Sequence, residues 1–217
     1  AACLLILQYV SFKLSYDQFH ENASNIYRVI NDRYQNGKLT QHSPQTYSAI
    51  GKALQDDYPQ DVAAYARIEP LWSRVLIYDD KKTEEPGLAV DNSFMTMFSF
   101  PLLAGDRSTA LEQPNSLILT EKLARKLLND PKDNPASFVG RMLRIENDSV
   151  LYKITGVCKD IPENSHLQFS FLKSYISLYK GGNNNWKAAN HSFKESYFWH
   201  YVQLKPGADH KKIQAKL

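Results

Sequence analysis

The N-terminal stretch limits the fold most strongly, because it is more apolar than a water-facing domain needs. Residues 1–12 contain no charged side chain, and the first charge is Lys13. A membrane-spanning helix needs about 20 apolar residues, so this run is too short to cross a bilayer. It also lacks the basic segment and the cleavage site of a signal peptide. The pattern predicts that residues 1–8 are the end of a truncated transmembrane helix; the alternative is a buried N-terminal core helix.

The C-terminal stretch also predicts a helix. Pro206 and Gly207 precede Asp209, which suits the N-cap position, and the chain stops at Leu217 after barely two turns. We expect this helix to be unfinished. A domain that is entered from a membrane helix and left through an unfinished helix is typical of an extracytoplasmic insert in a membrane protein.

The composition indicates a folded, water-facing body. The 217 residues are 43% hydrophobic and 12% aromatic, which is enough to bury a core in one large domain or two small ones. The net charge of +3 is too small and too dispersed to indicate a nucleic-acid-binding protein. The basic residues within 122–126 alternate with apolar ones, as on the solvated side of an amphipathic helix. Cys3 and Cys158 predict no disulfide framework.

The first part of the chain predicts a β-α-β-β order after the N-terminal helix. The expected elements are a helix over 9–24, a strand over 26–30, a helix over 44–58, and strands over 62–68 and 74–78. Helix 9–24 continues residues 1–8, and its aromatic residues recur near helical spacing. Ser43 suits the N-cap of helix 44–58, and Pro44 suits its first turn. Asn36-Gly37 predicts a polar turn.

The second part has its own set of short elements. We expect a short helix over 91–98, a helix over 121–128 capped by Thr120, and strands over 116–119, 142–145, 152–157, 167–171 and 197–204. The sequence therefore predicts an α+β fold of two lobes, a mixed sheet with packed helices plus an inserted smaller α+β lobe. Residues 9–87 and 165–217 form the first subdomain with its membrane stalks, and residues 88–164 form the inserted second subdomain.

Motifs of enzyme chemistry are missing from the sequence. There is no P-loop, no G-x-S-x-G elbow and no H-E-x-x-H motif, and no two of the six histidines have the spacing of a helical zinc site. Adjacent carboxylates at 56–57 and 79–80 suit a helix end and a solvated turn. Ser165 beside His166 lacks an orienting acid and an oxyanion hole, so a turn after Pro162 is the better interpretation. We expect no catalytic residue, no cofactor and no metal site.

An ordered set of short strings resembles a known family. The strings are Tyr9–His20, Ile26–Val29, Val90–Asp91, Phe98–Asp106, Pro114–Ser116, Leu119–Ala124, Val139–Gly140, Ile154–Val157, Asp160–His166 and Gln203–Gly207. Together they resemble the MacB-like periplasmic core domain of FtsX/MacB-type ABC transporter permeases, in the form common among Bacteroidetes-like bacteria. The departures are modest: Leu128-Asn129 stands where many relatives have Phe-Gly, and Ser137–Gly140 replaces a Pro-Ile-Gly.

The resemblance implies a mechanical part in the bacterial inner membrane, with this domain in the periplasm. Such a domain lies between the first and second of four membrane helices. ATP is hydrolysed by a separate cytoplasmic ABC ATPase domain or subunit, which this domain reaches through the membrane part. A second permease copy or a paralogue completes the transporter. Relatives drive efflux with an adaptor, extract lipoproteins, sense peptide antibiotics or control cell-wall hydrolases, so a periplasmic protein or a lipidic substrate is the expected partner.

Two other function classes stay open. One is a membrane-tethered extracytoplasmic sensor or ligand-binding module without transport, and the other is an extracytoplasmic hydrolase. Three further hydrophobic spans after Leu217 and a neighbouring ATPase gene would favour the permease.

Partner contacts are expected on loops far from the membrane, because function concentrates on loops carried by a rigid scaffold. The candidate loops are 79–86, 129–137 and 179–192. The last contains the predicted partner-binding residues Trp186, Asn184 and Lys187. An exposed Trp suits an interface anchor; the alternative is that Trp186 tucks into the body.

Overall fold

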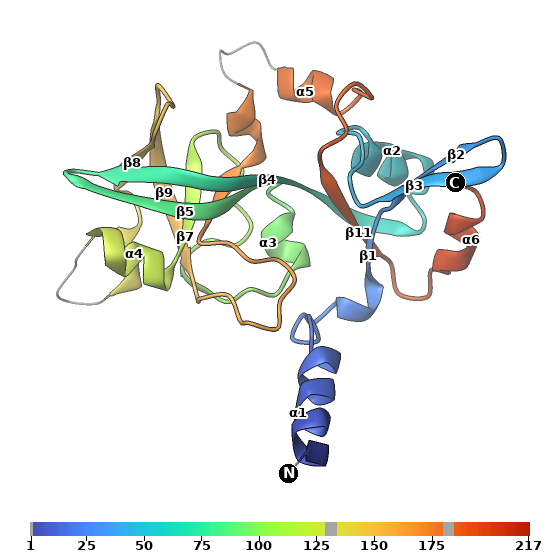
Figure 1. Cartoon of the computed structure of the whole chain (residues 1–217). Helices are drawn as coiled ribbons and strands as arrows, with labels where there is room; N and C mark the ends of the chain where they lie inside the picture. The colour runs from blue at the N-terminus through green and yellow to red at the C-terminus, as the bar shows by residue number, and fades with distance from the viewer. Residues whose placement is uncertain (1, 129–133, 180–184) are drawn as a thin grey trace.

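A mixed sheet organises the chain (Figure 1). The computed structural model describes residues 2–128, 134–179 and 185–217. Within these residues the sheet has the order β1-β11-β4-β5-β10-β7-β9-β6, and β8 pairs with β4 and β9. The strands are β1 (Ile26–Arg28), β4 (Val62–Tyr78), β5 (Lys81–Val90), β6 (Leu102–Gly105), β7 (Ser116–Thr120), β8 (Met142–Ile145), β9 (Leu151–Cys158), β10 (Phe171–Ser174) and β11 (Trp199–Leu204). Pairs β5–β10 and β7–β9 are parallel, and the other pairs are antiparallel.

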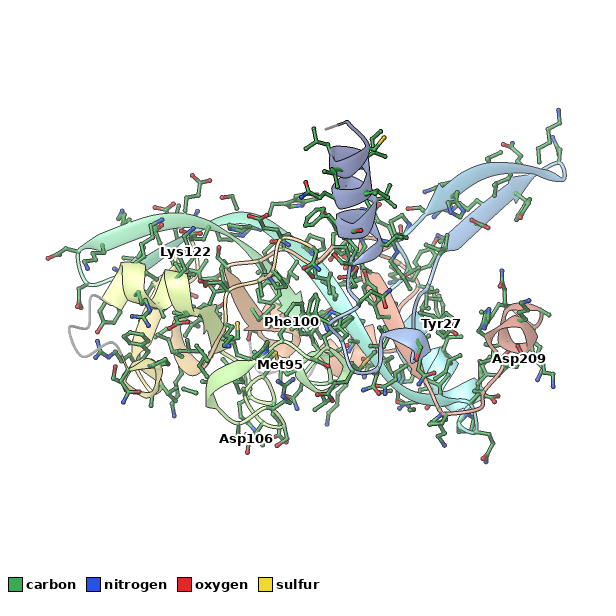
Figure 2. The ribbon with its side chains drawn as sticks, turned by 90° about the horizontal axis from the view of Figure 1, so that it is seen from below. Tyr27, Met95, Phe100, Asp106, Lys122 and Asp209 are labelled. Carbon is green, nitrogen blue, oxygen red and sulfur yellow. The ribbon has the colours of Figure 1, made fainter. Side chains whose placement is uncertain are left out.

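Helices α2 to α6 lie around the sheet, helix α1 extends away from it, and one hairpin stands apart (Figure 1). The helices are α1 (Ala2–Leu14), α2 (Ile50–Asp57), α3 (Phe94–Met97), α4 (Glu121–Leu128), α5 (Asn185–Ala189) and α6 (His210–Gln214), with 3-10 turns η1 (Ala23–Asn25), η2 (Pro135–Phe138) and η3 (Tyr175–Leu178). The separate hairpin consists of β2 (Asn31–Gln35) and β3 (Lys38–Ser43). In Figure 2, Tyr27 and Asp209 mark the end that holds β1 and α6, and Lys122 marks α4 at the other end. The predicted α+β class with a mixed sheet is confirmed.

The long β4–β5 hairpin connects the two ends of the molecule. Two strands were expected over 62–68 and 74–78, but they are one strand, β4, with a register shift between Pro70 and Trp72. Trp72 has a φ of 51° at this bulge, an unusual backbone conformation for a bulky residue. The first half of β4 pairs with β11, and its end pairs with β8. One long hairpin therefore pairs with strands in both parts of the body.

Three apolar clusters form the core. The central cluster surrounds α3 and includes Phe94, Phe98, Phe100 and Phe169; Figure 2 shows Met95 and Phe100 between the two ends. A second cluster lies under α4, whose Leu123 packs with residues of β7 and β9. A third joins α2 and α6 to β11. Each fully buried large side chain contributes about 1.5–3 kcal/mol, so the clusters stabilise both ends of the sheet.

The connectivity agrees with the expected first sheet. Strand β11 pairs with β1 and β4, and α2 contacts both β4 and β11. Strand β10 lies between β5 and β7, so hydrogen bonding continues from one end of the sheet to the other. These pairings do not test whether residues 88–164 fold as a separate unit, so the expected division stays a prediction.

Several predicted boundaries were wrong. The helix expected over 9–24 ends at Leu14, and the helix expected over 44–58 begins only at Ile50 because Thr46 forms a β-bridge with Phe198. Asn36 and Gly37 both have positive φ, 51° and 74°. That conformation suits a tight hairpin turn, so the chain forms β2 and β3 on either side of it.

Candidate functional site: the junction between α1 and the body

Helix α1 extends away from the body and touches it only near its C-terminal end (Figure 1). Its large apolar side chains are exposed, by between 41% for Phe12 and 73% for Leu14. A free helix of 13 residues is marginal in water. Across the described residues, no helix is both long and apolar enough to span a membrane. The attachment of α1 therefore depends on the few residues that follow it.

The chain leaves α1 through a tight turn. The Ser15 amide donates to the carbonyl oxygens of Ser11 and Phe12, and the Ser15 hydroxyl donates to Phe12 O at 2.8 Å. Asp17 then adopts a left-handed φ of 58°, which aspartate tolerates better than most residues. This turn ends the helix and directs the Asp17 carboxylate toward the body.

Asp17 joins this turn to the segment after Pro162. The Asp17 amide donates to Asn164 O at 2.9 Å. Its carboxylate accepts from the His166 amide at 3.1 Å and from the Ser165 hydroxyl at 3.3 Å. In return, the Asn164 side-chain amide donates to both the carbonyl and the hydroxyl oxygen of Ser15 at 3.0 Å. Hydrogen bonds to a charged group contribute about 1.5–3 kcal/mol each, so Asp17 is the strongest single attachment of α1.

His166 extends this network to the sheet. Its Nδ1 lies 2.6 Å from the Asp17 carboxylate, and its Nε2 lies 2.6 Å from the Tyr201 hydroxyl on β11. A carboxylate only accepts, so Nδ1 carries a hydrogen; in the neutral ring Nε2 then accepts from Tyr201. Burial raises the pKa of Tyr201 to about 12, which keeps the phenol protonated as a donor. A charge-assisted chain of hydrogen bonds thus connects the end of α1 to β11, the strand between β1 and β4.

A second attachment to the body follows Asp17 in the chain, at His20 and Glu21. The Glu21 amide donates to the Ser99 hydroxyl at 2.9 Å, and the Ser99 amide donates to His20 Nδ1 at 3.0 Å. The His20 ring packs edge-on against Phe98 and Phe100. Burial lowers the pKa of His20 to about 4, so the ring is neutral at pH 7 with its hydrogen on Nε2. Among the described residues this buried Nε2 has no hydrogen-bond partner.

The junction encloses a cleft of about 380 Å³, lined by Asp17, His20, Arg28, His166 and Tyr201 among others. The Asp17–His166–Tyr201 chain has the order of a catalytic triad, but Tyr201 is only 3% exposed and its hydroxyl is a protonated donor. Ser165 is 2% exposed and its hydroxyl is hydrogen-bonded. These features favour the turn interpretation of Asn164–His166. In the described part of the chain, no group of three or more His, Cys, Asp or Glu side chains could hold a metal ion.

A second buried polar cluster fixes the opposite side of the molecule. The Arg67 guanidinium forms a bidentate pair with Asp91, at 2.9 Å and 2.8 Å, and lies 3.9 Å from the Tyr175 ring centroid. Its Nη1 donates to Asn190 Oδ1 at 2.6 Å and to Ser48 O at 3.3 Å. Arg67 therefore holds the segment after α5 against the start of α2.

His200 lies next to Arg67 in the β4–β11 register. It is fully buried, and its Nδ1 lies 2.7 Å from the Thr46 hydroxyl. That hydroxyl donates to Phe198 O, so Nδ1 donates to it. Burial, with a smaller contribution from Arg67, lowers the pKa of His200 to about 3. This histidine is also neutral at pH 7.

Of the predicted partner-binding residues, the structure describes Lys187 and the backbone of Trp186, and both lie on α5, far from the junction. Helix α5 is at the top of Figure 1, opposite α1. Asn184 and the side chain of Trp186 lie outside the described residues, and Lys187 is exposed on α5. Trp72, which the sequence did not single out, is 73% exposed. The role of Trp186, Asn184 and Lys187 stays a prediction.

The sequence did not predict the junction. Asp17 and His166 belong to strings that carry the family resemblance, but they are 149 positions apart. Neither spacing nor periodicity indicates that such residues meet. The one available signal was that both strings hold polar residues beside turn-forming ones.

Known structures share this fold. A domain of a protein assigned as a permease from Porphyromonas gingivalis has 22% identity and a TM-score of 0.73, covering 91% of this chain and 83% of that one. The periplasmic region of MacB from Actinobacillus actinomycetemcomitans has 10% identity and a TM-score of 0.60, covering 89% and 80%. The extracellular domain of the noncanonic ABC-type transporter YknZ from Gram-positive bacteria has 14% identity and a TM-score of 0.56, covering 88% of both chains.

No curated protein matches this chain. The family profile of the MacB-like periplasmic core domain matches residues 1–217, the whole chain. The strings that suggested this family include both sides of the junction, Tyr9–His20 and Asp160–His166. The chain belongs to the MacB-like periplasmic core domain family of ABC transporter permeases.

Proposed function

We propose that this domain transmits ATP-driven movement of permease membrane helices to a periplasmic partner or substrate. The observation that carries the proposal is the Asp17 junction. Helix α1 continues into the body through a turn whose backbone and side chain are both bonded to residues 164–166. A flexible linker would absorb a displacement of α1, whereas this junction passes it on.

The route from the junction leads into the sheet. The Tyr201 hydroxyl on β11 donates to His166 at the end of the polar chain, and β11 pairs with β1 on one side and β4 on the other. The β4–β5 hairpin then reaches the far end of the molecule. Packed cores and sheets deform little, so a shift of α1 should move the body as one unit.

The proposal places the protein in the bacterial inner membrane with this domain in the periplasm. A separate ABC ATPase supplies the energy from the cytoplasm, and a second permease copy or a paralogue completes the transporter. The domain itself is not an enzyme. Its output is efflux, lipoprotein extraction, or a cell-wall or antibiotic response.

Asp17→Asn in the complete transporter should separate ATP hydrolysis from output. The amide keeps the size of the side chain but removes the negative charge. That charge accepts hydrogen bonds from the Ser165 hydroxyl and from the backbone amide and Nδ1 of His166. Losing about 2–3 kcal/mol of attachment at this point should reduce the cellular output at least about tenfold. The ATPase rate should stay near the wild-type value. Both are measured on the same strain, taking as output the phenotype lost when the permease gene is deleted.

Asp32→Asn is the matched control. Asp32 also lies 2.6 Å from a histidine Nδ1, that of His42, but on the β2–β3 hairpin outside the main sheet. It should leave output unchanged. Equal outputs for the two variants would contradict the proposal, and an output that persists without any ATPase would favour the membrane-tethered sensor.

A further inference from the structure

A polar groove lies away from the junction, between β4, η3 and the turn that joins β8 to β9. Its volume is about 500 Å³, within the range of binding sites for small ligands and side chains. Its charged lining residues are Glu69, Arg74, Glu146, Asp148 and Lys173. In Figure 1 the gold β8–β9 turn and the orange η3 lie above β4, on the side opposite α1. The elements that line the groove therefore lie on the side of β4 opposite α1.

Two of the charges in the groove satisfy each other. Lys173 Nζ lies 3.0 Å from Asp148 Oδ2 and 4.7 Å from the Tyr152 ring centroid, and the Tyr152 hydroxyl donates to the same carboxylate oxygen at 2.6 Å. Lys173 is only 6% exposed. This pair forms a fixed, nearly neutral part of the wall.

Glu69 is different, because it is half-buried and its carboxylate, unlike its backbone in the β4–β5 ladder, has no hydrogen bond or ion pair with any other described residue. Burial raises the pKa of its carboxyl group, and Lys173 and Arg74 oppose this shift only partly. The Arg74 guanidinium instead donates to Ser73 O. A partly buried carboxylate without a donor is costly. Glu69 is therefore the group in the groove that a ligand would satisfy best.

The remaining wall suits a long basic side chain. The half-buried Val75 and Leu178 provide apolar surface beside the carboxylates, whereas Leu71 and Ile145 are buried. Lysine and arginine bury their aliphatic stems against such surface. Carboxylates also outnumber cations among the lining residues. A metal ion fits less well, because the described residues contain no cluster of three or more suitable ligands.

We propose that this groove binds a lysine or arginine side chain of an extended basic peptide segment in a periplasmic partner. The ammonium or guanidinium group donates to Glu69, and the stem packs on Val75 and Leu178. The volume exceeds that of one side chain, so the flanking peptide occupies the rest. This binding does not depend on the transmission of movement, and it would hold for a sensor without transport.

The test is binding of a fluorescent peptide of alternating lysine and serine to the permease in lipid nanodiscs, followed by fluorescence anisotropy. Glu69→Gln should weaken binding at least about tenfold, the loss expected for a charge-assisted hydrogen bond. Glu112→Gln, an exposed carboxylate in a loop outside the groove, is the matched control and should bind as the wild type does.

A second peptide keeps the test independent of how the variant folds. With every lysine acetylated, the same peptide should lose binding to the wild-type protein. Absence of binding by the basic peptide, or equal affinity of the wild type and Glu69→Gln, would overturn the proposal. Displacement of the peptide by an equal concentration of spermidine would identify a small polyamine as the ligand instead and overturn the peptide assignment. None of these outcomes alters the ratio of ATPase to output measured for Asp17→Asn, so the two proposals fail separately.

Discussion

Replacing Arg67 with alanine should lower the free energy of unfolding by about 3–5 kcal/mol. Arg67 is only 2% exposed and its guanidinium supplies the bidentate partner of Asp91. The truncation leaves that carboxylate unpaired in a largely buried site and removes the cation above the Tyr175 ring. It also releases Asn190 and the Ser48 carbonyl. Breaking a buried pair costs more than the pair itself contributes, because one charge stays behind.

Urea denaturation followed by circular dichroism measures this change. Arg74→Ala is the matched control, since Arg74 is an exposed arginine on the same strand. Exposed substitutions of this kind stay within about 0.5 kcal/mol. A loss below about 1 kcal/mol for Arg67→Ala would show that the buried pair does not hold the segment after α5.

The second large effect is acid destabilisation between pH 6.5 and 5. Burial lowers the pKa of His20 to about 4 and that of His200 to about 3, from 6.5 when unfolded. Below pH 6.5 the unfolded chain therefore binds protons that the folded chain does not, and stability falls as the pH falls. Each histidine contributes about 0.7 kcal/mol per pH unit at pH 6.5 and about 1.4 at lower pH, so the two together should remove about 3 kcal/mol between pH 6.5 and 5. Unfolding free energies measured across this range test the slope.

Asparagine variants show how much His20 and His200 each contribute to the pH dependence of the unfolding free energy. Asn can place an amide oxygen or nitrogen near the Nδ1 position, which faces the Ser99 amide in one case and the Thr46 hydroxyl in the other. His20→Asn and His200→Asn should each reduce the slope by up to about one proton, or 1.4 kcal/mol per pH unit. His191→Asn, at an exposed position, should leave it unchanged. Unchanged slopes in both buried variants would mean that carboxylates control the acid response.

Local signals predicted the elements that carry strong periodicity. Helix α4 was predicted at its observed bounds, because Leu123, Ala124 and Leu127 mark one face and the Thr120 hydroxyl accepts from the Leu123 amide. Strand β8 was also predicted at its observed bounds, Met142–Ile145. The β2–β3 hairpin was missed, because most of its residues are exposed and polar and show no apolar alternation.

Long-range contacts explain the remaining errors. Helix 44–58 was expected too early because Ser43 and Pro44 look like a helix start, yet Ser43 ends β3 and Thr46 bridges to Phe198, 152 positions away. The junction depends on a contact of the same kind between Asp17 and His166. Local propensity cannot reveal a pairing that only the folded sheet creates. The family resemblance named the strings on both sides of the junction, but not their contact.

The central claim is that α1 and the body move together. Fluorescence resonance energy transfer from a dye on the protein to acceptor lipids in the membrane tests this claim most directly. A donor dye is attached at Lys122→Cys on α4 or at Lys13→Cys on α1, with acceptor lipids in the nanodisc. Cys3 is replaced by serine, and Cys158 can stay because it is buried and its thiol pKa is raised by burial to about 12. The complete transporter with its ATPase is measured without nucleotide and after trapping with ATP and vanadate.

Trapping should change the transfer efficiency at both positions in the wild type. In Asp17→Asn the change should persist at Lys13 and disappear at Lys122, because the helix still moves but the body no longer follows. A change at Lys13 without one at Lys122 in the wild type would contradict the account, as would an Asp17→Asn variant whose body moves as the wild type does.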